Sequence, residues 1–304
     1  MKEGIVMTSQ NFHIDAAQEA AILAGALPYL RRYAGDTIVI KYGGHAMGDD
    51  ILSSAFGRDI ALLKLVGINP VVVHGGGPQI NQMFERLGIS STFIDGLRVT
   101  DADMMDVIEM VLSGSVNKEV ARLITQAGAL AVGVSGKDGH MITACKMKRA
   151  HHDHQHDLGY VGTPIKVDPR VIYALSGSGL IPVIAPIGLG EDGTTYNINA
   201  DTAAGAVAGA VRATRLLMLT DVAGVLDRKG DLIPELTASQ ARQAIEQGII
   251  IGGMIPKVET CIEAVEGGAQ AAVIIDGRIP HACLLELFTA DGSGTLIRAD
   301  DEMK

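Results

Sequence analysis

Short apolar runs rich in β-branched residues recur along the chain, and amphipathic segments separate most of them. Six runs predict buried strands, at Thr37–Lys41, Pro70–His74, Ala131–Val134, Ile181–Ala185, Leu216–Leu219 and Ala272–Ile275. Apolar residues at helical spacing predict helices between them, for example at Ile51–Leu65, Gln79–Leu87 and Ala102–Gln126. Strands that alternate with helices form parallel crossover units, so the pattern predicts an α/β chain whose mainly parallel central sheet is covered on both faces. Ligands of such sheets bind beyond the carboxyl ends of the strands.

A further helical pattern precedes the first strand. From about Ile14 to Tyr33, apolar residues repeat along one stripe, and Pro28 inside it predicts a kink because proline removes a backbone donor. Residues 1–12 are expected to be a loose leader. Such an arm can pack on its own domain or reach a neighbouring subunit, and the pattern alone leaves both open.

Composition narrows the class of protein. The 304 residues are 47% hydrophobic with a formal net charge of −10, which excludes intrinsic disorder and argues against nucleic-acid binding. Cys145, Cys261 and Cys283 are widely spaced, so no disulfide framework or structural zinc site is expected. Acidic residues precede the apolar stretch at 20–30, and no run approaches the roughly 20 apolar residues of a membrane span. We therefore expect a cytoplasmic protein without membrane partners.

Two strands end in consecutive glycines that lead toward a helix. The first runs from Lys41 into Gly43-Gly44, and the second from His74 into Gly75-Gly76-Gly77. Such turns expose backbone N–H groups and let a phosphate or carboxylate approach without interference from a Cβ atom. A strict Walker loop, a dinucleotide GxGxxG and a GxSxG elbow are absent from the sequence. The two turns together predict an anion site of another kind.

Several polar residues lie in otherwise apolar surroundings. The Arg98 guanidinium could donate two parallel hydrogen bonds to a carboxylate of a ligand, or it could form a surface ion pair. Asp201 opens an Ala-rich helix, where it could simply be the N-cap. A lysine, Lys257, follows the Gly252-Gly253 pair at the start of another helix. The tract HHDHQHD at 151–157 fits a solvated hairpin tip better than a metal site.

Taken together and in order, these motifs resemble the amino acid kinase family. The matching stretches are IVIKYGGHAM (38–47), VVVHGGGPQIN (71–81), DGLRVTD (95–101), YNINADTAA (196–204), LTDVAGVLD (219–227) and GGMIPKV (252–258). The resemblance implies a three-layer α/β/α sandwich. Within the family it points to the branch that uses ATP and Mg²⁺ to phosphorylate the side-chain carboxylate of N-acetyl-L-glutamate in arginine biosynthesis.

The resemblance also assigns roles to individual residues. Lys41 and Lys257 would stabilise the transition state, Asp201 would orient both, and Gly44 would donate a backbone N–H to the transferring phosphoryl group. The residues that would hold acetylglutamate are Gly76, Gly77, Arg98 and Asn197. The residues that would line the nucleotide pocket are Thr220, Asp221, Gly224, Leu226, Gly253 and Met254.

Elementary chemistry agrees with this mechanism. Each unit-charge pair between the carboxylate and the γ-phosphate costs about 4 kcal/mol at about 4 Å and an effective dielectric near 20. Lysines and N–H donors offset this repulsion without a covalent intermediate. The carboxylate is already ionised at pH 7, so the reaction needs no general base, and we expect His45 and His74 to be structural.

Both ends of the chain resemble the arginine-inhibited, hexameric type, in which kinked helices interlace between dimers. Residues 1–35 would be this oligomerisation arm, and residues 36–304 the kinase domain, with an acetylglutamate lobe at about 36–200 and a nucleotide lobe at about 201–304. The tail at 281–297 would bind L-arginine, or is simply a final helix and strand. The residues implied for arginine are Tyr29, Glu286, Gly292 and Gly294.

Two other functions stay open at this point. One is a kinase for a related acylated amino acid of the aminoadipate type, which a cationic carrier-binding surface around the substrate mouth would favour, although the acidic chain shows no such surface. The other is a non-catalytic arginine sensor of the same fold, against which the joint presence of Lys41, Asp201 and Lys257 argues.

Overall fold

The computed structural model describes residues 15–94, 96–147, 149–151, 154–290 and 292–300. The expected leader at 1–12, and Ile14, Asp95, His152 and Asp153, lie outside the described residues. No helix among the described residues is both long enough and apolar enough to cross a membrane.

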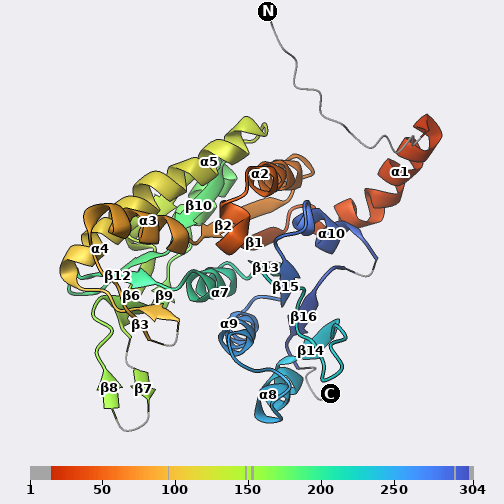
Figure 1. Ribbon diagram of the computed structural model, residues 1–304. Helices are drawn as coiled ribbons and strands as arrows, with labels where there is room; N and C mark the ends of the chain where they lie inside the picture. Colours follow the sequence, from red (N-terminus) through yellow and green to blue (C-terminus); the bar gives the residue numbers. More distant parts are fainter. Residues whose placement is uncertain (1–14, 95, 148, 152–153, 291, 301–304) are drawn as a thin grey trace, which may run out of the picture.

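A central sheet of eight strands runs through the described part of the chain, in the order β14-β16-β15-β13-β1-β2-β10-β5 (Figure 1). Neighbouring strands are parallel except β15 and β16. The bounds are β14 (Glu235–Thr237), β16 (Thr295–Arg298), β15 (Ala271–Asp276), β13 (Arg215–Thr220), β1 (Thr37–Tyr42), β2 (Asn69–His74), β10 (Ile181–Ala185) and β5 (Ala131–Ser135). All six predicted strands are confirmed to within one residue at each end.

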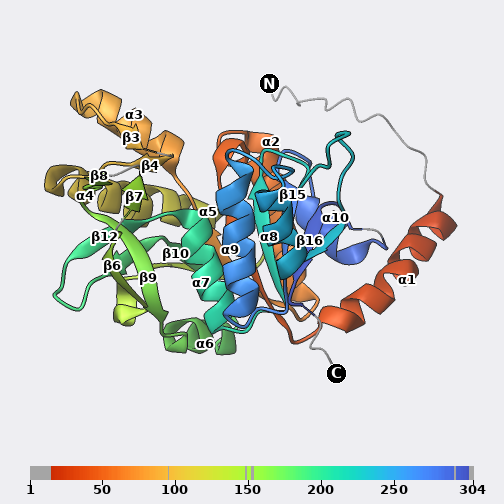
Figure 2. The same ribbon diagram turned by 90° about the horizontal axis from the view of Figure 1, so that it is seen from below.

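Helices cover both faces of the sheet, so the predicted three-layer α/β/α sandwich is confirmed (Figures 1 and 2). Alternate residues of each strand enter two separate cores: Ile38 and Ile40 of β1 face one core, and Val39 faces the other. The first core includes residues of α2 (Asp50–Leu65), α3 (Gly77–Leu87), α4 (Ala102–Glu109), α5 (Asn117–Gln126) and α10 (Ala282–Phe288). The second includes residues of α6 (Arg170–Gly177), α7 (Ala200–Ala210), α8 (Ala238–Glu246) and α9 (Met254–Glu266).

The helix predicted over 102–126 has the expected extent but not a uniform geometry. Its middle, η2 (Met110–Val116), is a π-helix between α4 and α5. The wider π turn contains Leu112 and Val116, which are buried. The π-helix packs against the second glycine turn, because Leu112 and Val116 lie next to Gly76.

A small closed barrel at one end of the sheet was not predicted. Its strands are β6 (Ile142–Lys146), β9 (Val161–Val167), β12 (Thr195–Ile198) and β11 (Ile187–Leu189). Two hairpins accompany it, β3 (Phe93–Ile94) with β4 (Leu97–Arg98), and β7 (Arg149–His151) with β8 (His154–His156). The second hairpin includes His151 and residues 154–156 of the His-rich tract; that this tract is solvated stays a prediction. Cys145, on β6, is exposed, whereas Cys261 and Cys283 are buried, and all three are free thiols.

The N-terminal arm is α1 (Ala16–Tyr33), a helix assigned without a break through Pro28. Its last residue, Tyr33, is buried and lies beneath the Arg32 and Arg215 guanidinium groups. The rest of α1 extends away from the body of the protein, with its final turns beside α10 (Figures 1 and 2). The kink at Pro28 and the oligomerisation role of the arm stay predictions.

Candidate active site

The two glycine turns lie together at the carboxyl ends of β1 and β2. The Gly75 amide donates to the Tyr42 carbonyl at 2.7 Å, which joins the end of one strand to the loop after the other. Gly44 has a φ of +69°, a left-handed conformation that glycine adopts without strain. The close packing of the turns is also visible at Gly43, where an added Cβ atom would lie 3.3 Å from Lys41 Nζ.

One largely buried carboxylate holds both predicted catalytic lysines. Asp201 Oδ1 lies 2.9 Å from Lys41 Nζ, and Asp201 Oδ2 lies 3.1 Å from Lys257 Nζ. Lys41 comes from β1, Asp201 from the first turn of α7 and Lys257 from the first turn of α9. The fold therefore brings together three residues that are far apart in the sequence.

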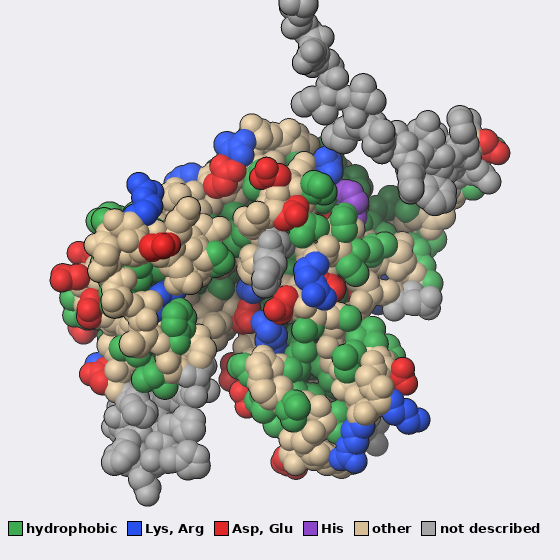
Figure 3. All heavy atoms as spheres, in the orientation of Figure 1, with side chains coloured by type: hydrophobic (Ala, Val, Ile, Leu, Met, Phe, Trp, Pro, Cys, Tyr) green, Lys and Arg blue, Asp and Glu red, His purple; other side chains and the backbone are tan. Residues whose placement is uncertain are grey.

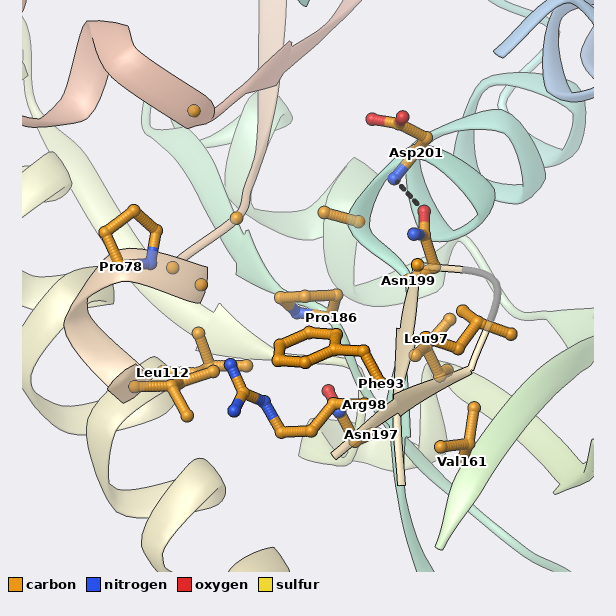
Figure 4. A pocket seen from close by; sticks show the side chains of 18 of the residues that line it. Pro78, Phe93, Leu97, Arg98, Leu112, Val161, Pro186, Asn197, Asn199 and Asp201 are labelled. Carbon is orange, nitrogen blue, oxygen red and sulfur yellow. Dashed lines mark hydrogen bonds between the residues drawn. The ribbon is translucent and has the colours of Figure 1, made fainter. Parts of the chain in front are cut away.

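Asp201 is not the N-cap of its helix. That position belongs to Asn199, whose Oδ1 accepts from the Asp201 amide at 2.8 Å and from the Thr202 amide at 3.3 Å (Figure 4). The alternative of a merely capping role for Asp201 is wrong, because the preceding asparagine already satisfies the helix end. The Asp201 side chain is thereby free to reach the lysines.

Electrostatics keep Asp201 ionised. Burial acts to raise the pKa of its carboxyl group, but the Lys41 and Lys257 ammonium groups outweigh burial and hold the pKa below its ordinary value. A carboxylate that stays charged between two cations is unsuited to proton transfer at neutral pH. In the cluster, Asp201 fixes the positions of the Lys41 and Lys257 ammonium groups.

A cavity of about 300 Å³ opens beside this cluster, where Figure 3 shows the surface hollowed and basic and acidic side chains gathered. The predicted site residues that line it are Lys41, Gly44, Gly76, Gly77, Arg98, Asn197 and Asp201. Arg98 and Asn197 reach it from β4 and β12, beside Phe93 (Figure 4). The structure thus brings together every residue assigned to acetylglutamate with two of the assigned catalytic side chains.

Arg98 is a buried cation whose partners are neutral. Its guanidinium donates to Ser91 Oγ and Asn81 Oδ1, both at 2.6 Å, and lies 4.5 Å from the centroid of the Phe93 ring. Burial lowers the pKa of the group. The side chain is buried, so the alternative of a surface ion pair is wrong, and no carboxylate of the described residues pairs with it. A buried positive charge without a counter-charge is suited to an anionic ligand.

The residues assigned to the nucleotide lie at the same end of the sheet. Lys41 is opposite Met218 of β13, and Thr220 and Asp221 follow on that strand's carboxyl end. Gly224 lies so close to Thr295 that a Cβ atom would be 2.6 Å from its hydroxyl oxygen. Asp221, Leu226 and Gly253 are exposed, and Met254 is half-buried in the turn that carries Lys257. Nucleotide contact by this set stays a prediction.

The residues assigned to arginine fall into two groups. Glu286 Oε2 accepts from the Ser293 amide at 2.7 Å, and Gly292, with a φ of +66°, leaves room for that carboxylate. Gly294 passes so close to Ile274 that a Cβ atom would lie 2.1 Å from its carbonyl oxygen. Burial raises the pKa of Glu286. Tyr29 comes from another element, α1, and is half-buried.

The predicted site residues are held in place by hydrogen-bond partners that the sequence analysis did not identify. Ser91 and Asn81 hold Arg98, Asn199 caps the helix that carries Asp201, and Asn117 contacts His74. Only Asn199 had a usable signal, because an asparagine two positions before the first helical aspartate is typical of an N-cap. The others depend on contacts between distant elements.

His74 belongs to the core, as a structural histidine would. It is fully buried, and burial lowers its pKa to about 4, so the ring is neutral at pH 7. The side chain of His45 is outside the described part of the structure, so its structural role stays a prediction.

Comparisons with known proteins agree with the geometry. A model of the amino acid kinase family matches residues 36–276. A protein named acetylglutamate kinase from Gluconacetobacter diazotrophicus is 71% identical over 301 residues, 97% of this chain and 95% of that protein. One of the same name from Gluconobacter oxydans is 69% identical over 94% of this chain and 99% of that protein.

A solved structure is similar to nearly the whole chain. N-acetylglutamate synthase from Neisseria gonorrhoeae, complexed with coenzyme A and N-acetyl-glutamate, has a TM-score of 0.81 and 26% identity, covering 93% of this chain and 64% of the synthase chain. The same synthase complexed with coenzyme A and L-arginine has a TM-score of 0.76 and 26% identity, covering 92% and 65%.

Neutral burial of His74 makes the fold sensitive to acid. An unfolded histidine titrates near 6.5, so between about pH 6.5 and 4 the unfolded chain binds the extra proton and stability falls as the pH drops. We expect His74 to account for about 2 kcal/mol of the loss in unfolding free energy between pH 7 and pH 5. Denaturant unfolding of the wild type and His74→Asn at both pH values measures it, and equal losses in the two proteins would contradict the assignment.

Proposed function

The chain belongs to the amino acid kinase family, and from that membership we propose that it transfers the γ-phosphoryl group of ATP to the side-chain carboxylate of N-acetyl-L-glutamate. The new bond joins phosphorus to a carboxylate oxygen, and the bond to the β-phosphate oxygen breaks, so the products are N-acetyl-L-glutamyl 5-phosphate and ADP. We propose that the step belongs to arginine biosynthesis, as the resemblance to the family implies, and relatives named acetylglutamate kinase support this substrate.

The observation that carries this proposal is a pair of lysines on one largely buried carboxylate, beside a cavity lined by an arginine that has no carboxylate partner among the described residues. Arg98 and Asn197 would hold a carboxylate of the substrate. The backbone amides of Gly76 and Gly77 would donate hydrogen bonds to other oxygen atoms of the substrate. Lys41, Lys257 and the Gly44 amide would then meet the charge that develops on the transferring phosphoryl group. The nucleophile is ionised at pH 7, and the chain need only position it.

Magnesium would enter on the nucleotide. The described residues hold no group of three or more His, Cys, Asp or Glu side chains that could ligate an ion, and both Asp201 oxygens contact lysines. The residues therefore do not fit a protein-held metal. Mg²⁺ prefers phosphate oxygens and water, so we propose that ATP binds as its Mg²⁺ complex.

The same observations bear on the cellular location of the protein and on the two alternative functions, a non-catalytic arginine sensor and an aminoadipate-type kinase. The cysteines are free thiols, as expected in the reducing cytoplasm, where ATP is also supplied. A non-catalytic sensor would have no need to hold two lysines on one carboxylate. A kinase for an aminoadipate derivative is less well supported than one for acetylglutamate, because the relatives at 71% and 69% identity carry the acetylglutamate name.

We also propose feedback inhibition by L-arginine in a homohexamer built as a trimer of dimers. The support is the projecting helix α1, its position beside α10 and the loop that Glu286 shapes with Gly292. The synthase of the same fold has been solved with L-arginine. Such control requires that arginine bind two states of the assembly with different affinity.

The activity test compares substrates and lysine variants in one assay. We expect ATP consumption with N-acetyl-L-glutamate and not with glutamate, aspartate, carbamate or an acylated aminoadipate. Lys41→Ala and Lys257→Ala should each lower kcat about 10²- to 10³-fold, since each removes a charge felt mainly in the transition state. Lys166→Ala, in an exposed position on the barrel, is the control and should match the wild type. Near-normal turnover in both site variants would refute the mechanism.

Removing the buried guanidinium should act on substrate binding. Arg98→Ala should raise KM for acetylglutamate roughly 10- to 100-fold, the effect of losing hydrogen bonds to a charged group, and leave KM for ATP unchanged. Arg98→Lys keeps the charge but not the fork and should recover only part of the loss. Steady-state kinetics with each substrate varied in turn would measure both, and an unchanged acetylglutamate KM removes Arg98 from the substrate site.

Deletion of the arm tests the assembly. A chain lacking residues 1–30 keeps the buried Tyr33, so its kinase domain should fold and turn over substrate normally. Its mass by light scattering should fall from that of a hexamer to that of a dimer, and inhibition by L-arginine should weaken. An unchanged mass contradicts the interlacing role.

A further inference from the structure

A hydrogen-bond chain runs under the second glycine turn. Asn117 Nδ2 lies 3.1 Å from His74 Nε2, and His74 Nδ1 lies 2.7 Å from the Gly75 carbonyl oxygen. The same amide nitrogen donates to the Val183 carbonyl at 2.9 Å and the Val134 carbonyl at 3.1 Å. Asn117 is fully buried and therefore ties together β2, β10 and β5, three strands that are adjacent in the sheet.

These contacts determine where the histidine carries its proton. Two carbonyl oxygens face one end of the Asn117 amide, so that end must be the NH₂ group. His74 Nδ1 faces the Gly75 carbonyl oxygen, which can only accept, and His74 Nε2 faces this NH₂ group, which cannot accept, so the proton of the neutral ring is on Nδ1. The Nδ1–H group can then donate to the Gly75 carbonyl.

The orientation of that carbonyl governs the next amide. A peptide unit is planar and trans, so the Gly75 C=O and the Gly76 N–H point in opposite directions. With the carbonyl directed at the buried histidine, the Gly76 amide is directed the other way, and Gly76 lines the cavity. Among the described residues, no protein acceptor is found for the amides of Gly76 or Gly77. They remain available to a ligand.

The π-helix supports the same turn from above. It ends one residue before Asn117, and its Leu112 side chain is so close to Gly76 that an added Cβ atom would lie 2.5 Å away. The Asn117 side chain also packs against Gly133, where an added Cβ atom would lie 1.8 Å from Asn117 Oδ1, so only glycine fits there. π turns are rare and often mark functional positions.

We propose that Asn117 is a positioning residue for phosphoryl transfer: it fixes the Nδ1–H form of His74, which holds the Gly75 carbonyl and so aims the Gly76 amide at the substrate. Asn117 does not touch the substrate, and it acts only through His74. This role rests on the proposed function, because it concerns the amide assigned to acetylglutamate.

Substitutions at His74 test whether the donor to Gly75 matters. His74→Leu removes it and should raise KM for acetylglutamate about tenfold, with a much smaller change in kcat and in KM for ATP. His74→Asn can place an N–H near the same carbonyl and should restore KM to within about threefold of the wild type. Equal increases in the two variants would overturn the proposal.

A double-mutant cycle tests whether Asn117 acts through His74. Asn117→Asp presents an acceptor to Nε2, so it should draw the proton there and raise the acetylglutamate KM in the wild-type background. In the His74→Asn background the same change should have little effect on KM, whereas equal effects in both backgrounds would overturn the proposal. Ile124→Ala, a buried substitution in the same helix, is the control for lost stability and should leave KM unchanged.

The proton position can be measured without any substrate. In ¹⁵N-labelled protein the His74 ring should show the Nδ1–H tautomer at pH 7 in the wild type and lose it in Asn117→Asp; an Nε2–H tautomer in the wild type would refute the proposal. This measurement stands even if the wild type fails to phosphorylate acetylglutamate, which would refute only the proposed function. If Asn117→Asp does not fold, the His74 pair and the wild-type spectrum decide.

Discussion

The site depends on one carboxylate that holds two cations from opposite halves of the sheet. Lys41 is on β1, which has β2, β10 and β5 on one side, and Lys257 is in the first turn of α9, which lies in the chain between β14 and β15 of the other side. Two ammonium groups this close repel each other, and Asp201 offsets that repulsion at contacts of 2.9 and 3.1 Å. The three groups keep a net positive charge at the rim of the cavity, as an anionic reaction requires.

Six of the eight strands of the central sheet could be predicted because they are runs of mostly apolar residues buried on both faces, such as β15, whose first five residues are apolar and whose six residues are all buried. The barrel could not. Its strands are as short as three residues in β11, and they contain Gly162 and Gly188, which lower strand propensity. These glycines are there because Tyr196 and Ile198 pack against them. That reason is visible only once distant strands meet.

The same distinction holds for the site. Lys41 and the glycine turns could be placed together because the carboxyl ends of neighbouring parallel strands share an edge. The partners of Arg98 come from two other segments, and the link from Asn117 to His74 spans 43 positions and a π turn. Hydrophobic periodicity has no signal for a π turn, because it disrupts the spacing by a single residue.

The unequal exposure of the three thiols has a practical consequence. Burial raises the pKa of Cys261 and Cys283, so these two resist alkylation, whereas Cys145 is open to solvent on β6 of the barrel. A maleimide dye would therefore label the natural chain at one position, without engineered cysteines. Because that position belongs to the same barrel as Asn197, fluorescence from the dye could follow the barrel as ligands enter and leave.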